Sequence, residues 1–328
     1  MLPILHLFER YSKNPILIPQ TRNRWESKAV FNCGAIFDDK IHLFYRAIGE
    51  YQKYVSSIGY AYSNDGYSFE RQKNIAIPTT ENYEKYGMED PRITKIQNKI
   101  IITYVVLTDY VTKQPKVSSA LAITPDYVNF KKLGIITDYV EENKDVVFFA
   151  EKLNSNNGDG GSFFSLHRPG KWVGRIYGTN KPSIWIGEGN SLNVISKFSL
   201  LMKPEQEWES LKIGVGPPPI KTSKGWLILY HGVDNDRVYR VGAALLDLQD
   251  PKKILARTKD PIFEPTEAYE RFGDVNNVVF PTGLAVIDEK VFMYYGAGDK
   301  VCCLAIADTD QLVEHELTNN SASNTWNG

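Results

Sequence analysis

Short apolar segments recur along the chain at regular intervals. Each holds four or five residues, is rich in aromatic and β-branched side chains, and spans 43–46, 102–105, 164–168, 228–231 or 292–295. Aligned on Tyr45, Tyr104, His167, Tyr230 and Tyr294, the segments are 59, 63, 63 and 64 residues apart. The five copies predict a structural repeat of about sixty residues.

A second set of apolar segments follows the first within each repeat. Most of these segments run into an Asp, Gly or Pro turn, and they span 58–66, 120–126, 183–186, 242–247 and 304–308. Aromatic and β-branched residues favour strands, and turn formers separate the two segments. The sequence therefore predicts that each repeat contains two strands, each followed by a turn.

These repeats predict an all-β fold, a five-bladed β-propeller in a single domain. Regular short strands without a helical period fit a radial array of four-stranded sheets, which also protects most strand edges. Two stacked β-domains are the alternative, which we disfavour because no linker of shifted composition separates the halves. We expect an N-terminal arm at 1–13, the propeller at 14–315 and a flexible tail at 316–328.

The innermost strands of a propeller converge on an axial pocket to which every blade contributes side chains. Charged residues beside apolar strands cost free energy unless they are paired or used. Seven polar residues are therefore candidates for a site: Asn32, Arg46, Asp90, Arg168, Lys212, His231 and Asp299. Singly, each is also explained as a solvent-exposed strand end or a structural side chain. Arg46 and Arg168, however, recur at nearly the same place in the repeat, which favours one shared site.

Residues 87–93, Gly-Met-Glu-Asp-Pro-Arg-Ile, hold the acid that we expect to be central. Pro91 keeps Asp90 out of the α region, so we expect Asp90 to be extended or turning at the end of a strand. Successive side chains of an extended chain point to opposite faces, so Glu89 and Asp90 are not expected to serve one site. The alternative is an ordinary Asp-Pro turn.

Arg168, Lys212 and His231 form a predicted cationic group suited to an oxyanion. A guanidinium binds phosphate through two parallel hydrogen bonds, and an ammonium adds a compact charge. The Gly and Pro residues of 214–219 predict a rigid approach that holds Lys212 at the site, although an ordinary connection between blades explains them too. The group has no carboxylate pair for a metal, and the chain has no glycine-rich nucleotide loop.

The amino-acid composition limits the classes of partner that we expect. Lys plus Arg number 38 and Asp plus Glu 39, so the net charge of −1 gives no reason to expect nucleic acid or an anionic membrane. The three cysteines have neither metal-ligand spacing nor an even number, which indicates buried thiols in a reducing compartment. Residues 2–8 are apolar but lack the flanks of a signal peptide, and no apolar run approaches the roughly 18 residues of a membrane span. We expect a cytoplasmic protein with a small-molecule or protein partner.

Nine runs of residues resemble the signature segments of glycoside hydrolase family 130, in order over 14–310. The runs are Asn32, Tyr45-Arg46, 87–93, 167–169, 212–222, 225–227, 230–233, 245–247 and 295–299. The family comprises inverting β-mannoside phosphorylases and some β-mannosidases. The resemblance implies a five-bladed propeller, in agreement with the repeats.

The resemblance also implies a role for each candidate residue. Asp90 matches the general acid, which in this family delivers its proton to the glycosidic oxygen through a sugar hydroxyl. Arg168, Lys212 and His231 match positions that bind phosphate.

Other positions of the family bind the sugar, and here they correspond to Asn32, Arg46 and Asp299, with Tyr239 as an addition. Two departures bear on phosphate use and acceptor choice. Many members have an arginine at Ser57 and a proline at Ala150, and the loop at 153–162 is longer here than usual.

An inverting hydrolase needs a second carboxylate to activate water, whereas phosphate is already an anionic nucleophile. Since this sequence has the cations, we predict a phosphorylase that releases α-mannose 1-phosphate reversibly, with inorganic phosphate as co-substrate and no cofactor or metal. Its substrates are β-1,2- or β-1,4-linked mannosides with mannose, glucose or N-acetylglucosamine as acceptor. A β-mannosidase and a non-catalytic carbohydrate-binding propeller are the alternatives, and a homo-oligomer is open because family members often assemble.

Overall fold

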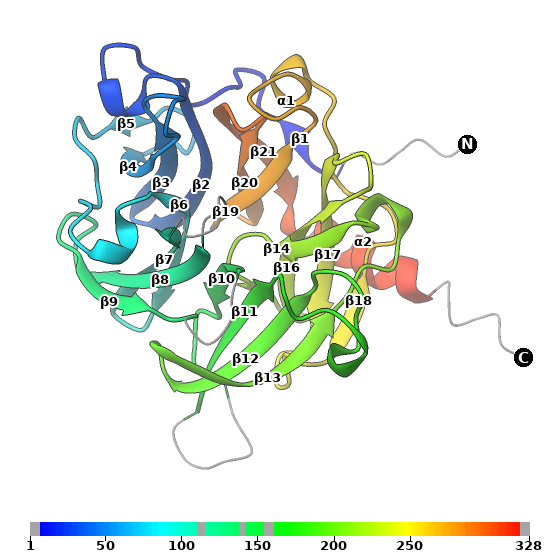
Figure 1. The fold of residues 1–328 in the computed structure, drawn as a ribbon. Coiled ribbons are helices and arrows are strands. Elements are labelled where there is room, and N and C mark those ends of the chain that lie inside the picture. The colour runs from blue at the N-terminus through cyan, green and yellow to red at the C-terminus, as the bar shows by residue number, and fades with distance from the viewer. Residues whose placement is uncertain (1–6, 110–115, 138–141, 154–160, 322–328) are drawn as a thin grey trace, which may run out of the picture.

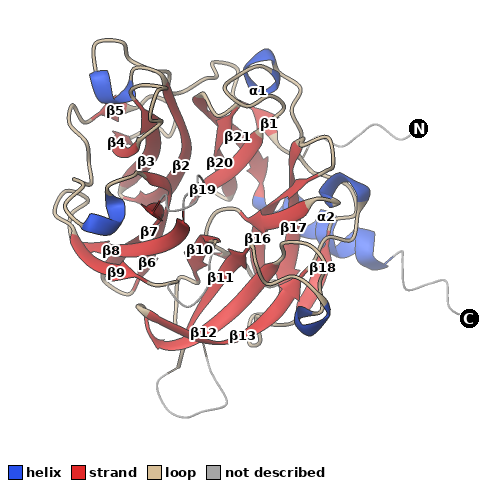
Figure 2. Cartoon of the chain, viewed as in Figure 1, coloured by secondary structure: helices blue, strands red, loops and turns tan. Residues whose placement is uncertain are grey.

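The computed structural model describes residues 7–109, 116–137, 142–153 and 161–321. In this part of the chain, five antiparallel sheets stand around a central axis (Figure 1). Strands dominate, and the few short helices lie at the periphery (Figure 2). The predicted all-β, five-bladed propeller is confirmed.

The sheets follow one another along the chain, and each is a blade whose first strand lies nearest the axis. Blade 1 contains β2 (Ala29–Asp38), β3 (Lys40–Ile48), β4 (Ser56–Ser63) and β5 (Glu70–Arg71). Blade 2 contains β6 (Met88–Ile96), β7 (Lys99–Asp109), β8 (Lys116–Thr124) and β9 (Lys131–Ile135). Blade 3 contains β10 (Asn143–Phe148), β11 (Phe163–Pro169), β12 (Ile184–Ser191) and β13 (Val194–Met202).

The last two blades complete the ring. Blade 4 contains β14 (Lys212–Val215), β16 (Trp226–Val233), β17 (Tyr239–Leu246) and β18 (Ile254–Arg257), with β15 (Ile220–Lys221) also paired to β16. Blade 5 contains β19 (Val279–Ile287), β20 (Lys290–Ala297), β21 (Val301–Asp308) and, as its outermost strand, β1 (Glu9–Arg10).

The two ends of the chain meet at blade 5. Strand β1, which falls in the expected N-terminal arm, pairs with β21 through Glu9 opposite Ile306. Helix α2 (Thr309–Ser321) follows β21 and extends past the expected start of the tail at 316, while residues 322–328 lie outside the described part. None of the described helices is long and apolar enough to cross a membrane.

The core lies between neighbouring blades, because each sheet is covered on both faces. All eight residues of β16 are buried, which explains why this strand is a continuous apolar run without alternation. Leu229 and Val241 of blade 4 share one apolar cluster with Met293 and Tyr295 of blade 5. Stacking of sheet on sheet therefore fixes the blades around the axis.

Four of the five blades contain one type of buried cluster. A tyrosine of the second strand donates its hydroxyl to a fully buried glutamate in the turn before the inner strand, and a cation of the outermost strand pairs with that glutamate. The clusters are Tyr45 with Glu26 and Arg71, Tyr104 with Glu84 and Lys132, Tyr230 with Glu209 and Arg257, and Tyr295 with Glu270 and Arg10. We call these the tyrosine clusters.

The tyrosine clusters correct the sequence repeat at one point. Tyr295, not Tyr294, is the fifth equivalent residue, so the last step is 65 residues (295 − 230). In blade 3 the equivalent residue is His167, whose Nδ1 lies 3.0 Å from the amide nitrogen of Asn143. The next position along the strand carries Arg46, Arg168 and His231, which confirms their shared register.

Candidate active site

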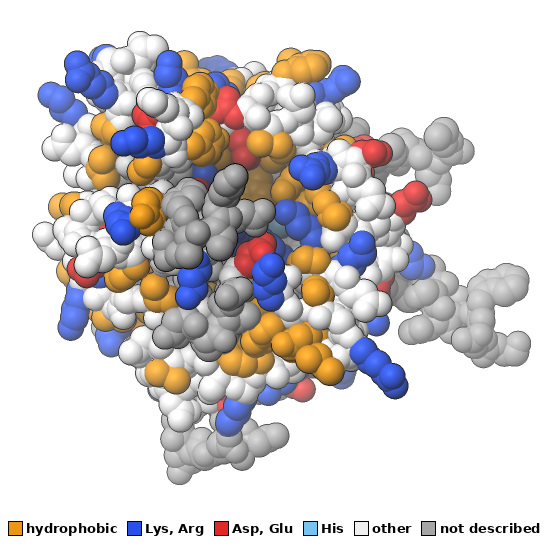
Figure 3. Space-filling model, viewed as in Figure 1, with side chains coloured by type: hydrophobic (Ala, Val, Ile, Leu, Met, Phe, Trp, Pro, Cys, Tyr) orange, Lys and Arg blue, Asp and Glu red, His pale blue; other side chains and the backbone are white. Residues whose placement is uncertain are grey.

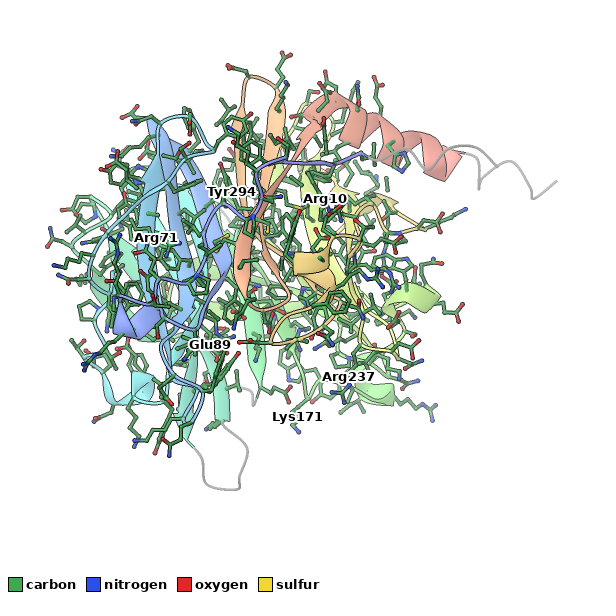
Figure 4. All side chains as sticks on the ribbon, turned by 90° about the horizontal axis from the view of Figure 1, so that it is seen from above. Arg10, Arg71, Glu89, Lys171, Arg237 and Tyr294 are labelled. Carbon is green, nitrogen blue, oxygen red and sulfur yellow. The ribbon has the colours of Figure 1, made fainter. Side chains whose placement is uncertain are left out.

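A cavity of ≈ 170 Å³ lies on the propeller axis and receives side chains from all five blades. Figure 3 shows this face hollowed near its centre, with acidic and basic side chains around the hollow. Figure 4 places Glu89, Lys171 and Arg237 toward one end of the propeller and Arg10 and Tyr294 toward the other. All eight residues predicted from the sequence line this cavity: Asn32, Arg46, Asp90, Arg168, Lys212, His231, Tyr239 and Asp299.

Three inner strands carry the same backbone irregularity at the cavity. The pairing of β2, β6 and β10 with the next strand shifts register at Asn32, Asp90 and Asp145, respectively. These residues have φ values of 49°, 49° and 61°, in the left-handed region that Asn and Asp tolerate better than most residues. The repeated bulge places one polar side chain from each of three consecutive blades at the cavity.

This geometry overturns two expectations about Asp90. Asp90 lies near the start of β6 rather than the end of a strand, and its backbone is left-handed within the strand rather than extended or in a turn. Because the bulge breaks the alternation of side chains, Glu89 and Asp90 both reach Arg46. Nη2 of Arg46 is 2.5 Å from Glu89 Oε1, and Nη1 is 3.3 Å from Asp90 Oδ1.

One wall of the cavity, the acid wall, is built around Arg46. Its Nε donates to Ser56 at 2.9 Å, so all three guanidinium nitrogens have a partner. Asp90 Oδ1 also accepts a hydrogen bond of 2.8 Å from Asn32 Nδ2. Both carboxylates are therefore held in fixed positions, with Asp90 facing the cavity.

Asp299 completes the acid wall from the turn after β20. Burial raises its pKa to about 6; Arg46 opposes this rise, and Asp90 and Glu89 add to it. A carboxylate near other carboxylates takes up a proton more readily than usual. Asp299 thus changes charge within the physiological pH range.

The opposite wall is built around Asp145, and we call it the phosphate wall after the role that the sequence predicts for it. Arg168 Nε donates to Asp145 Oδ2 at 2.9 Å, and Arg92 Nη2 donates to Oδ1 at 3.1 Å. His231 Nε2 is 4.0 Å from Oδ2. Lys212 lies beside this group with its ammonium 5.2 Å from the centre of the Tyr239 ring, within the range of a cation–π contact.

The predicted cationic group needs one correction, because His231 is not a cation at neutral pH. Burial lowers the pKa of His231 well below its usual value; Asp145 opposes this, while Arg168 and Lys212 add to it. Burial also lowers the pKa of Lys212 to about 8, helped by Arg168. At pH 7 the wall therefore contains the guanidiniums of Arg92 and Arg168 and the ammonium of Lys212, with the imidazole of His231 neutral. Lys144 also lines the cavity.

Several residues of the site were missed by the sequence analysis: Glu89, Arg92, Lys144, Asp145, Val275, Val278 and Phe280. A signal existed for Asp145, because Asn32, Asp90 and Asp145 follow one another at steps of 58 and 55 residues. Aligning inner strands would have found it. The apolar residues 275, 278 and 280 carry no comparable signal.

The remaining expectations concern residues away from the cavity. Ser57 lies in β4 opposite Ala47, and Ala150 is exposed just after β10; neither is among the described residues that line the cavity. Residues 154–160 of the long loop lie outside the described part. Among the described residues, no group of three or more His, Cys, Asp or Glu converges as a metal site would.

Comparisons with known proteins bear on the family of this chain. The family model described as beta-1,4-mannooligosaccharide phosphorylase, glycoside hydrolase family 130, matches residues 4–316. A 1,2-beta-oligomannan phosphorylase of Thermoanaerobacter sp. is 39% identical over 308 residues, which is 92% of this chain and 97% of the relative. A beta-1,2-mannobiose phosphorylase of the same organism is also 39% identical, over 316 residues, covering 92% and 98%.

A solved structure shares the fold. The beta-1,2-mannobiose phosphorylase of Listeria innocua, in complex with beta-1,2-mannobiose, superposes with a TM-score of 0.83 at 28% identity, covering 95% of this chain and 99% of that one. The family model spans nearly the whole chain, and the relatives exceed a third in identity over nearly their full length. The chain therefore belongs to glycoside hydrolase family 130.

Proposed function

We propose that this chain is an inverting β-mannoside phosphorylase. Inorganic phosphate attacks the anomeric carbon of a non-reducing mannosyl unit, the glycosidic bond breaks, and α-mannose 1-phosphate and the shortened acceptor are formed. The observation that carries the proposal is one small cavity with an excess of carboxylates on one wall and an excess of cations on the other. That division suits a reaction between a proton-requiring leaving group and an anionic nucleophile.

The phosphate wall would bind and aim the nucleophile. A guanidinium binds an oxyanion through two parallel hydrogen bonds. Arg168 uses its Nε for Asp145, so its two terminal nitrogens remain for phosphate. Lys212 adds charge and His231 adds a neutral hydrogen bond. Binding phosphate in this orientation replaces the second carboxylate that an inverting hydrolase would need.

The acid wall would bind the mannosyl unit and protonate the leaving oxygen. Asp90 is the general acid, acting through a sugar hydroxyl as the family resemblance implies. Asn32, Arg46 and Asp299 supply donors and acceptors for the hydroxyls of the mannosyl unit, and Tyr239 lines the same cavity with its ring beside the Lys212 ammonium. The reaction as proposed needs no cofactor and no metal.

We propose β-1,2-linked mannosides as substrates, with β-1,4-linked mannosides second. Two relatives at 39% identity and a structure at a TM-score of 0.83 are named for β-1,2-linked substrates, whereas the family description names β-1,4-linked ones. The two linkages place the acceptor sugar differently over the same mannosyl unit. The linkage is therefore the part of the proposal that needs a direct test.

Product analysis tests the proposal. The purified protein is incubated with β-1,2- and β-1,4-mannobiose, each with and without inorganic phosphate. We expect mannose 1-phosphate from the β-1,2 substrate and only when phosphate is present. Mannose released equally in both conditions would identify a β-mannosidase, and sugar binding without any product would identify a carbohydrate-binding propeller.

A further inference from the structure

Asp145 has no role in the reaction described so far, yet it is the most enclosed carboxylate of the cavity. Its exposed fraction is 2%. It accepts one hydrogen bond from Arg168 and one from Arg92, and it lies near His231. A buried carboxylate between two guanidiniums stays ionised: burial opposes ionisation, but Arg168 and Arg92 outweigh it and lower the pKa of Asp145.

The contact with Arg168 determines how that guanidinium lies. Asp145 takes the Nε–H, and among the described residues this is the one hydrogen bond that the Arg168 side chain makes. Because a guanidinium is planar, fixing its Nε fixes the plane of the two terminal nitrogens as well. Those nitrogens form the edge that binds an oxyanion with two hydrogen bonds.

A second contact connects Asp145 to the acid wall. Arg92 donates from Nη2 to Asp145, from Nη1 to the backbone oxygen of Asp90 at 2.9 Å, and from Nε to the backbone oxygen of Gly216 at 2.9 Å. Arg92 is thus fully used inside the protein and does not face the ligand. It joins the bulge of β10 to the bulge of β6.

The space around Asp145 also depends on a glycine. A Cβ added at Gly214, which pairs with His231 in blade 4, would lie 2.3 Å from His231 Cε1 and 2.6 Å from Asp145 Oδ2. Real Cβ atoms do not approach other atoms so closely, so a side chain at this position would displace both groups. The backbone of blade 4 therefore leaves room for the carboxylate and the imidazole together.

We propose that Asp145 is a positioning residue, which orients Arg168 for phosphate and offsets the charge of the buried cations before phosphate arrives. This inference rests on the proposed function, because it assumes that Arg168 binds phosphate. Asp145 does not touch the sugar. Its removal affects the phosphate wall and leaves mannoside binding intact.

Asp145→Asn is the first test, because the amide keeps the size of the side chain but turns a donor toward the guanidiniums. We expect kcat/KM for phosphate to fall about tenfold to a hundredfold, the range for losing a hydrogen bond to a charged group, with KM for mannobiose nearly unchanged. Glu89→Gln, the matched change on the acid wall, is expected to raise KM for mannobiose instead. Equal effects of Asp145→Asn on both substrates would overturn the proposal.

The double variant Asp145→Asn with Arg168→Lys separates orientation from general destabilisation. If Asp145 acts through Arg168, the double variant loses no more phosphate use than Arg168→Lys alone. Losses that multiply would show that Asp145 acts elsewhere. If the wild-type enzyme forms no mannose 1-phosphate, the proposed function is wrong. If the wild type is active and Asp145→Asn is unaffected, only this inference is wrong.

A measurement on the wild type covers the case in which the variant does not fold. In spectra of ¹⁵N-labelled arginine, we expect the Nε–H of Arg168 to exchange slowly and to stay in place when inorganic phosphate is added, while the terminal nitrogens shift. The exposed Arg237 is the internal reference for fast exchange. An Arg168 Nε–H that exchanges as fast as that of Arg237 would contradict the proposal.

Discussion

The two walls of the cavity use the same backbone feature and opposite ratios of charge. On the acid wall, two carboxylates, Glu89 and Asp90, share one guanidinium, that of Arg46. On the phosphate wall, two guanidiniums, those of Arg92 and Arg168, share one carboxylate, that of Asp145. Within these groups each wall has a surplus of one charge, to which Asp299 adds on the acid wall and Lys212 on the phosphate wall.

The difference lies in the partners supplied by neighbouring blades, because Asp90 and Asp145 occupy equivalent bulges. From the preceding blade, Asp90 receives the amide of Asn32 and the guanidinium of Arg46, which Glu89 shares. Asp145 instead has two guanidiniums, that of Arg92 from the preceding blade and that of Arg168 from its own. A wall rich in carboxylates and a wall rich in cations thus lie side by side in a chain whose net charge is −1.

The largest effect is expected from Asp90→Asn, which removes the proton donor but keeps the side-chain shape and the contact with Asn32. General acid catalysis contributes about 10²- to 10⁴-fold, so phosphorolysis should fall by that factor while mannoside binding persists. Initial rates of mannose 1-phosphate formation and calorimetric titration with mannobiose give the two values. Undiminished turnover would remove Asp90 from the mechanism.

Lys212→Ala tests the phosphate wall in the same way. The loss of one ammonium should raise KM for phosphate about tenfold to a hundredfold and leave KM for mannobiose nearly unchanged. Steady-state kinetics with each substrate varied in turn measures both constants. A parallel rise in both would mean that Lys212 stabilises the cavity as a whole, and a matched melting curve would show it.

Glu89→Gln reduces the carboxylates paired with Arg46 from two to one. Arg46 then pairs with Asp90 alone, and we expect KM for mannobiose to rise about tenfold, as for one lost charge-assisted hydrogen bond. KM for phosphate should stay the same. If the phosphate constant moves instead, the two walls are not independent, and Arg92 is the link that would couple them.

The sequence predicted the five repeats and the propeller, because aromatic strands repeat at a nearly constant spacing. Seven of the eight residues predicted for the cavity were candidates from the sequence pattern, and Tyr239 came from the family resemblance. The prediction failed at the bulges. The alternation rule separated Glu89 from Asp90, but a left-handed residue reverses that rule at one position, and a single sequence does not show which Asp is left-handed.

The sequence also could not predict the protonation state of the site residues. His231 was grouped with the cations because its type and position matched, yet its charge depends on burial and on Arg168 and Lys212 nearby. Asp145 was missed for a related reason. The sequence Lys-Asp-Val-Val at 144–147 matches no known motif, and the partner of Asp145, Arg92, is brought to it only by the packing of two blades. Both facts arise from packing between blades that are far apart in sequence.

The two walls should also respond to opposite ends of the pH range. Asp299, with a pKa of about 6, becomes neutral as pH falls through 6, so KM for mannobiose should rise several-fold there. Lys212, with a pKa of about 8, loses its proton as pH rises through 8, so KM for phosphate should rise there. Asp299→Asn should abolish the rise in KM for mannobiose below pH 6 and keep the rise in KM for phosphate above pH 8.

Unfolding does not account for the expected rise in KM for phosphate above pH 8. The pKa of Lys212 is lower in the folded chain than in the unfolded chain, so above pH 8 the unfolded state binds the additional proton. By linkage, this group makes the free protein more stable as pH rises. A melting temperature that fell in step with phosphate use between pH 8 and 9 would contradict this account.

The smallest effect on activity is expected from Tyr295→Phe, which changes a tyrosine cluster and touches neither wall. The substitution removes the 2.8 Å hydrogen bond to Glu270, but Glu270 keeps its ion pair with Arg10 and its backbone donors at Thr266 and Glu267. We expect a loss of about 1 kcal/mol in the free energy of unfolding, measured by denaturant titration, with both KM values unchanged. A change in either KM would mean that the tyrosine clusters set the position of the inner strands, and that the charge ratio of the walls depends on blade packing as well as on local partners.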